Sequence, residues 1–188
     1  WLDTAWGLVA ALPAAFADLR AQVLLQQLEL DRRRDRHAPA TLLEYLKIPR
    51  RSSPARQLEK VPDGHVAKLG ADLSRWLGLP HVGDDGALLA HHVHAHLRAG
   101  HPADRLREGL DEDWLRAQEA EVALVDGRAD AEHHARRLGA AAAALRDRVD
   151  VEILPHVPAV FGPDDAVSFD VAAKNAWPLH LRVYRADV

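Results

Sequence analysis

The residues whose types and spacing could most readily bind a metal or take part in catalysis are four histidines, His91, His92, His94 and His96. On a helix, His92 and His96 lie one turn apart, and two imidazoles at that spacing could share a metal ion. A zinc-protease motif would place a glutamate directly after the first ligand, whereas Val93 follows His92. No carboxylate partner is identifiable. We therefore predict that His91–His96 is a histidine-rich helix face and not a tight metal site, with His91 and His94 directed to solvent.

A second cluster is basic and lies within residues 32–60. Its cations are Arg32, Arg33, Arg34, Arg36, Lys47, Arg50, Arg51, Arg56 and Lys60, set against Asp35, Glu44 and Glu59. Such a patch could contact nucleic acid or an acidic partner. Proteins that bind single-stranded nucleic acid interleave stacking aromatics with their cations, and only Tyr45 is available here. We interpret the cluster as a solvated helix end and loop, and we expect no nucleic-acid partner.

Two smaller clusters have structural explanations. His133 and His134 are adjacent, so on a helix they point about 100° apart and cannot act as a pair. The acids at 111–113 precede an apolar helical stripe, where they would cap the helix and complement its dipole. No nucleophile elbow, phosphate-binding loop or dinucleotide fingerprint is present. We therefore assign no catalytic, cofactor-binding or metal-ligating residue, expect no cofactor, and expect that the chain is not an enzyme.

These residues must be positioned by a chain whose first 148 residues show helical spacing of apolar positions. The first helix is expected from residue 3 or 4 to near Pro13, and the second from Pro13 to the charged residues 31–36. Further helices are expected around residues 42–46, 66–77, 88–97, 102–109, 114–125 and 131–148. Residues 49–63 are rich in proline and serine and poor in apolar residues, which indicates a loop. We predict a helical domain over residues 1–148, built of helical hairpins, with a possible internal loop at 49–63.

The pattern changes at Val149, where apolar residues begin to alternate with polar ones as in half-buried antiparallel strands. Three strands are expected, with inward positions at Val149, Val151 and Ile153, at Val167, Phe169 and Val171, and at Leu179, Leu181 and Val183. Three strands cannot close a sandwich, so we predict that residues 149–188 begin a truncated β-sandwich with an exposed apolar face and unpaired edges. The fold class is mainly α followed by a partial antiparallel β-sandwich, α+β overall.

Composition narrows the possible classes. The chain has 188 residues, of which 48% are hydrophobic, and a net charge of −4, so it can bury a core but has no global basic field for nucleic acid or an anionic membrane. No apolar run approaches the roughly 20 residues of a membrane-spanning helix, so we expect no direct membrane insertion. The chain starts at Trp1 and contains no methionine. We therefore expect it to be a piece of a longer protein.

The junction between the two regions resembles the large bacterial alpha-2-macroglobulin-like proteins. The resemblance is carried by residues 148–153, 161–167, 174–176 and 179–184, in the order proline, turn, strand, Lys-Asn, strand. Upstream, residues 43–50 and 113–115 look like the helical segment that precedes a macroglobulin domain in very large members.

This resemblance implies a non-catalytic structural segment of a protease-trapping inhibitor in the periplasm or at the cell surface, or secreted. Its partners would be the remaining domains of the same chain and, through the full-length protein, proteases. The thioester of that family needs a cysteine, and this chain has none, so no functional residue is carried over.

Two other classes stay open. One is a helical protein–protein interaction module with an appended β-domain. The other is a histidine-based metal-binding domain. A metal-binding domain would need the His91–His96 cluster to hold an ion tightly. Sequence beyond Val188 would separate the inhibitor segment from the interaction module, because several more β-domains and a Cys-x-Glu-Gln string would support the inhibitor.

Overall fold

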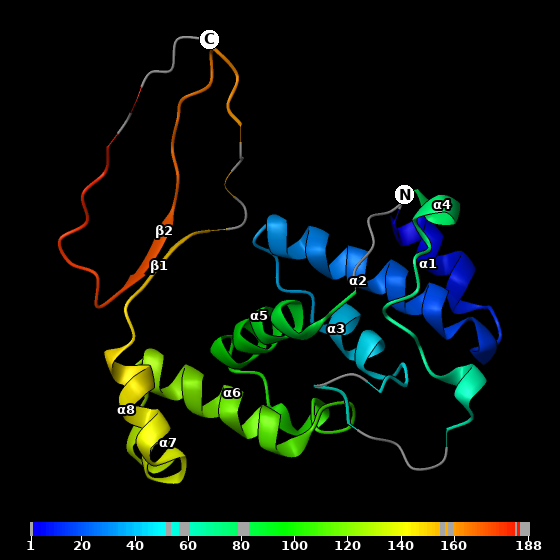
Figure 1. The fold of residues 1–188 in the computed structure, drawn as a ribbon, viewed down its shortest axis with the longest axis horizontal. Helices are drawn as coiled ribbons and strands as arrows, with labels where there is room; N and C mark the ends of the chain where they lie inside the picture. Colours follow the sequence, from blue (N-terminus) through cyan, green and yellow to red (C-terminus); the bar gives the residue numbers. More distant parts are fainter. Residues whose placement is uncertain are drawn as a thin grey trace.

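The computed structural model describes residues 2–51, 54–56, 61–78, 83–154, 157, 160–182 and 184, with the side chains of all of these except residues 2, 3, 76 and 77. The described chain is mainly helical and ends in a small antiparallel sheet, so the predicted α+β class is confirmed (Figure 1). The α-helices are α1 (Leu2–Ala10), α2 (Ala17–Arg33), α3 (Pro39–Leu46), α4 (Ser74–Leu77), α5 (Gly86–Arg98), α6 (Glu112–Val125), α7 (Ala131–Leu138) and α8 (Ala140–Asp147). Three 3₁₀ turns, η1 (Ala14–Phe16), η2 (Asp63–His65) and η3 (Ala103–Arg105), lie between them.

The core is formed where α2, α3 and α5 meet, with α6 packed beside α5 (Figure 1). Each helix supplies a stripe of apolar residues at three- and four-residue spacing, which makes one face apolar and directs it to the core. The fully buried side chains of this core include Leu25, Leu28, Leu42, Tyr45, Leu89, Val93, Leu106 and Leu115. The helical stripes at 42–46, 88–97 and 114–125 are therefore confirmed as core-forming helices.

The predicted helix at 66–77 is wrong over most of its length, because only Ser74–Leu77 is helical. Tertiary contacts take the backbone groups that a helix would use. Ala67 N donates to Pro49 O at 2.8 Å, and Lys68 N donates to the Asp18 carboxylate at 2.6 Å. Ala67 and Leu69 still reach the core, but from an extended segment. In the expected loop 49–63, residues 52, 53 and 57–60 lie outside the described part of the chain.

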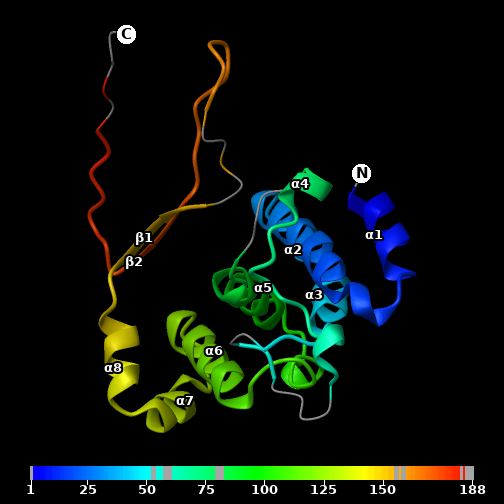
Figure 2. The same cartoon turned by 45° about the vertical axis from the view of Figure 1, so that its right-hand side comes forward.

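The predicted single helix at 131–148 is also wrong, because Gly139 divides it into α7 and α8. Gly139 has φ +56° and ψ −125°, a conformation that is open to glycine and strained for other residues. Both short helices pack on α6 (Figure 2). The alanine-rich sequence after Gly139 has high helix propensity, whereas glycine is a poor helix former, so the break falls at the residue that best permits the change of direction required by this packing.

Gly109 lets the segment after η3 approach α3 closely. A Cβ atom at this position would lie 2.5 Å from Leu46 O and 2.7 Å from Leu46 Cβ. The segment is held there by hydrogen bonds from Arg56 N to Gly109 O (3.0 Å) and from Asp111 N to Pro54 O (2.9 Å). These hydrogen bonds hold the backbone at Gly109 close to Leu46, so the segment cannot easily move away to make room for a side chain.

We expect Gly109→Ala to lower the free energy of unfolding by about 1–3 kcal/mol, the usual cost of overpacking. Urea denaturation followed by circular dichroism measures this loss. Gly64→Ala is the matched control, because a Cβ at Gly64 meets no atom within 4 Å. Equal stability of the two variants would show that the segment relaxes without cost.

The sheet is a ribbon of two strands, β1 (Asp150–Ile153) and β2 (Val171–Lys174), which pair antiparallel with Val151 opposite Ala173. The ribbon follows α8 and extends beside the helices in both views (Figures 1 and 2). The expected second strand begins only at Val171, and residues 176–182 form no strand; Val183 lies outside the described residues.

The predicted half-burial of the strands is wrong, because the apolar side chains of the ribbon are exposed. Val151 is 54% exposed and Ile153 is 60% exposed. The physical reason is that within the described chain the ribbon has neither a second sheet nor a helix against its apolar face. Asn175 adopts the left-handed region with φ +53°, and its Nδ2 donates to Arg146 O and Arg148 O, so the expected Lys174-Asn175 turn is present and is tied to the end of α8.

Candidate functional site

The histidines of α5 are mostly packing residues. His92 is fully buried and its Nε2 lies 2.9 Å from Leu28 O, so this nitrogen donates to the carbonyl of α2. His96 is 3% exposed, with its Nε2 3.3 Å from Pro102 O. Burial, the largest cause, lowers the pKa of both imidazoles. The two residues whose spacing could have allowed a shared metal ion thus each bind a different backbone carbonyl.

The prediction that His91 and His94 point to solvent is wrong. Both side chains are partly buried, and His94 Nε2 lies 2.8 Å from the Gln118 Oε1 atom of α6. Burial lowers the pKa of both imidazoles. The reason is that both α2 and α6 pack against α5.

The structure also brings together three histidines that the sequence pattern did not connect. The His96 ring centroid lies 5.5 Å from that of His37 and 4.9 Å from that of His101. Both ring nitrogens of His37 lack a hydrogen-bond partner among the described residues. Burial and the neighbouring imidazoles lower the pKa of His37. Across the described part of the chain, no group of three or more histidine or acidic side chains is arranged to hold a metal ion.

The basic residues of segment 32–60 do not form one patch. Arg32 and Arg33 both bind the Glu29 carboxylate at 2.8 Å, and the hydrogen bond from Arg32 is the largest cause that lowers the Glu29 pKa to about 2. Arg36 pairs with Asp31 at 2.6 Å. These pairs support the predicted solvated helix end. Arg50 departs from the prediction, because it is buried in the core.

Arg50 belongs to a buried polar cluster with Tyr45 and Asp85. The Tyr45 hydroxyl donates to Asp85 Oδ2 at 2.6 Å, and Arg50 Nε lies 3.1 Å from the same oxygen, too poorly aligned for a hydrogen bond. Arg50 Nη1 donates to the carbonyls of Tyr45 and Ile48, both at 3.0 Å. Burial raises the pKa of both Tyr45 and Asp85, and the Arg50 charge opposes that rise. This cluster connects α3 to the start of α5.

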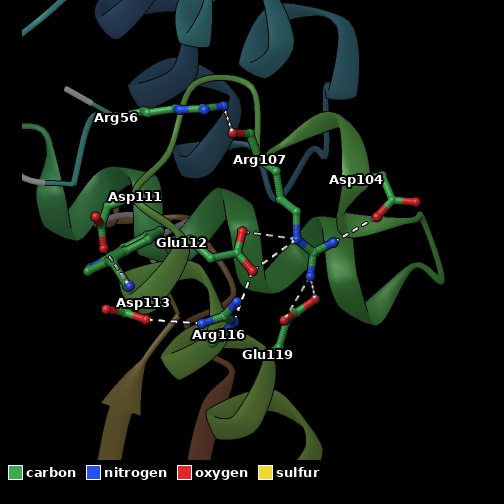
Figure 3. A network of polar contacts seen from close by, with 9 residues as sticks. Arg56, Asp104, Arg107, Asp111, Glu112, Asp113, Arg116 and Glu119 are labelled. Carbon is green, nitrogen blue, oxygen red and sulfur yellow. Dashed lines mark hydrogen bonds and ion pairs between the residues drawn. The ribbon is translucent and has the colours of Figure 1, made fainter. Parts of the chain in front are cut away.

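The acidic residues at 111–113 cap and brace α6, as predicted. Asp111 accepts a hydrogen bond from Trp114 N at 2.9 Å, the geometry of an N-terminal cap. Figure 3 shows Arg107 at the centre of the surrounding ion pairs, with contacts to Asp104, Glu112 and Glu119. The His133 and His134 rings make an edge contact, with their centroids 5.7 Å apart and their planes at 82°.

A cleft of about 730 Å³ remains between α3 and the segment that contains η3, and we call it the α3 cleft. Its apolar wall includes Leu43, Ile48, Pro49, Ala55 and the backbone of Gly109. Charged residues line it as well: Glu44, Lys47, Arg50, Arg56, Arg105 and Glu108. Concave, mostly apolar sites of this size are the usual places where proteins accept a ligand or an anchoring side chain.

The helical region carries the family relationship. The family model described as "Actin-binding protein F N-terminal domain" matches residues 1–149. The chain belongs to this family. The match covers every described helix and ends just before β1. No curated protein and no solved structure matches this member of the actin-binding protein F N-terminal domain family.

This membership overturns the resemblance to alpha-2-macroglobulin-like proteins. The segments that carried it lie mainly in residues 148–184, and strand–turn–strand patterns of that kind recur in many β-proteins. The reading as part of a protease-trapping inhibitor, with proteases as partners, was therefore wrong. The alternative of a helical protein–protein interaction module fits the actin-binding protein F N-terminal domain better. Within the described residues, no helix is long and apolar enough to cross a membrane.

Proposed function

We propose that this chain is a non-enzymatic protein-interaction module and that its partner is actin. The observation that carries the proposal is the match of residues 1–149 to the actin-binding protein F N-terminal domain. The chemistry of the described residues is compatible with it, since the clustered histidines, acids and arginines are used in packing, capping and ion pairs. A partner would therefore bind to the surface of the helical region.

The α3 cleft is a part of that surface suited to a protein contact. Leu43 and Ile48 form part of its apolar wall. On the buried side of α3, the hydrogen bond from Arg50 to the Tyr45 carbonyl holds the helix in place. Exposed Arg105 stands at the cleft with no ion pair found among the described residues, so its charge is available to an acidic group of the partner. An apolar pocket with a charged rim is the common anatomy of protein interfaces.

Co-sedimentation of the full chain with filamentous actin tests the proposal. We expect saturable binding, and we expect Arg105→Glu to weaken it about tenfold or more by placing a like charge at the rim. Arg137→Glu on α7 is the matched control, because Arg137 is exposed and lies outside the cleft.

The outcomes separate the parts of the proposal. If the chain binds neither filaments nor monomeric actin, the assignment of actin as the partner is wrong. If it binds and the two variants behave alike, actin remains the partner but the α3 cleft is not the contact surface.

A further inference from the structure

The two edges of the ribbon differ in how they could pair with another strand. Leu154 N donates to Asp170 O at 2.9 Å, which continues the β1–β2 register by one residue pair. In an antiparallel pair the backbone groups of alternate residues point to the same side. Asp170, Ala172 and Lys174 therefore direct their backbone groups to β1, while Val171 and Ala173 direct theirs outward. In the described chain, β2 pairs with β1 alone.

The outer edge of β2 is also open in space. From the turn at Asn175, residues 176–182 diverge from β2 in both views (Figures 1 and 2). Val171, Ala172 and Ala173 are exposed. An exposed edge with an apolar neighbourhood is a template for adding a strand.

Two registers that would pair the outer edge of β1 with a second copy are unfavourable. In an antiparallel pair, directly opposite residues lie on the same face of the sheet. A pair with two-fold symmetry must therefore place one residue opposite its own copy, and we say that the pair is centred on that residue. Centring on Val151 sets Asp150 against Glu152 of the second copy. Centring on Glu152 sets that residue against itself. Both arrangements place like charges opposite each other, which destabilises a sheet.

The outer edge of β2 favours such pairing. A symmetric antiparallel pair centred on Ala172 sets Val171 against Ala173 of the second copy, so the outward backbone groups of both residues are satisfied. The same register sets Asp170 against Lys174 of the second copy, an opposite-charge pair that occurs twice. The Lys174 ammonium donates to Arg146 O at 2.6 Å and retains further N–H donors.

We propose that two copies of this chain associate through β2, in an antiparallel register centred on Ala172, to form a four-stranded sheet. The apolar residues Val151, Ile153 and Val171 of both copies then lie on one continuous face. The association is independent of actin binding, because the ribbon lies outside the residues that match the family.

Cysteine cross-linking tests the register, and the chain has no native cysteine. In this register, the Cα atoms of the two Ala172 residues are about 4.5 Å apart, as in a non-hydrogen-bonded pair, which suits a disulfide. The two Ala173 residues are diagonal neighbours about 7–8 Å apart, which does not. Under mild oxidation, Ala172→Cys should give a covalent dimer at least tenfold faster than Ala173→Cys. Equal rates, or no dimer from either variant, would overturn the proposal.

Charge reversal provides an independent measurement by sedimentation velocity. Wild-type chain should show a concentration-dependent dimer, and Asp170→Lys or Lys174→Asp alone should abolish it by setting like charges opposite each other. An equimolar mixture of the two variants should recover dimer, because every cross-copy pair is then of opposite charge. Failure of the mixture to recover dimer, with both variants as helical as wild type by circular dichroism, would refute the register.

Discussion

Asp85→Asn is expected to lower the free energy of unfolding by about 3–5 kcal/mol, because it leaves the Arg50 guanidinium buried without its counter-charge. Both side chains are 0% exposed, so water cannot replace the lost carboxylate. Asparagine keeps the size of the side chain and can still accept the Tyr45 hydroxyl, so the loss reports mainly the charge. Urea denaturation at pH 7.5 measures it.

Two further variants separate charge from packing. Asp84→Asn is the matched control, since Asp84 is exposed and, among the described residues, the hydrogen bond found for its side chain comes from Gly86 N, which asparagine can still accept. The double variant Arg50→Met/Asp85→Leu removes both charges and should be more stable than Asp85→Asn alone. If the double variant were the less stable, the hydrogen bonds that it removes, from Arg50 to the carbonyls of Tyr45 and Ile48 and from the Tyr45 hydroxyl to Asp85, would matter more than the charge.

The second large effect is loss of stability in mild acid. Burial is the largest cause that lowers the pKa of His37, His91, His92, His94 and His96. Their folded-state pKa values lie below the ordinary value of 6.5, so the unfolded chain binds more protons in mildly acidic solution. Stability is therefore complete above about pH 6.5 and falls as the pH drops towards and through the folded pKa values.

Urea denaturation between pH 7.5 and 5.0 measures this dependence. For fully buried His92, the slope approaches at most about 1.4 kcal/mol per pH unit. His92→Gln should flatten the pH profile, because glutamine does not titrate, even if it lowers stability at pH 7.5. Exposed His133→Gln is the control for replacing a histidine outside the core. A wild-type stability that is constant down to pH 5.0 would contradict the expected proton uptake.

The sequence predicted the elements whose signals are local. The apolar stripes of α3, α5 and α6 follow from helical periodicity, and the Asp111 cap follows from an acid placed just before such a stripe. The change to β structure after α8 follows from alternation of apolar and polar residues. In each case the deciding contacts lie within a few residues of one another, so the pattern itself contains the information.

The sequence patterns did not identify the family, because the patterns that suggested a family occur in many unrelated proteins. The strings in residues 148–184 are degenerate, since any exposed strand and turn produces alternation with Pro, Gly and Asn. The relationship lies in residues 1–149, where the spacing of apolar residues indicates amphipathic helices but no particular family. Periodicity identifies a helix but not which family of helices it belongs to.

The tertiary structure decided the rest, because the deciding contacts are distant in sequence. Ala67 leaves the helix predicted for it to pair with Arg50, and Gly139 breaks an alanine-rich helix so that α7 and α8 can both reach α6. Arg50 lies in a basic segment of the sequence that is typical of a surface. It is nevertheless buried, because its charge is paired with Asp85, which is 35 residues later in the chain. His37 and His96 meet only because α2 and α5 pack together. The cost of burying a charge or an imidazole depends on its partner, and only the folded chain supplies that partner.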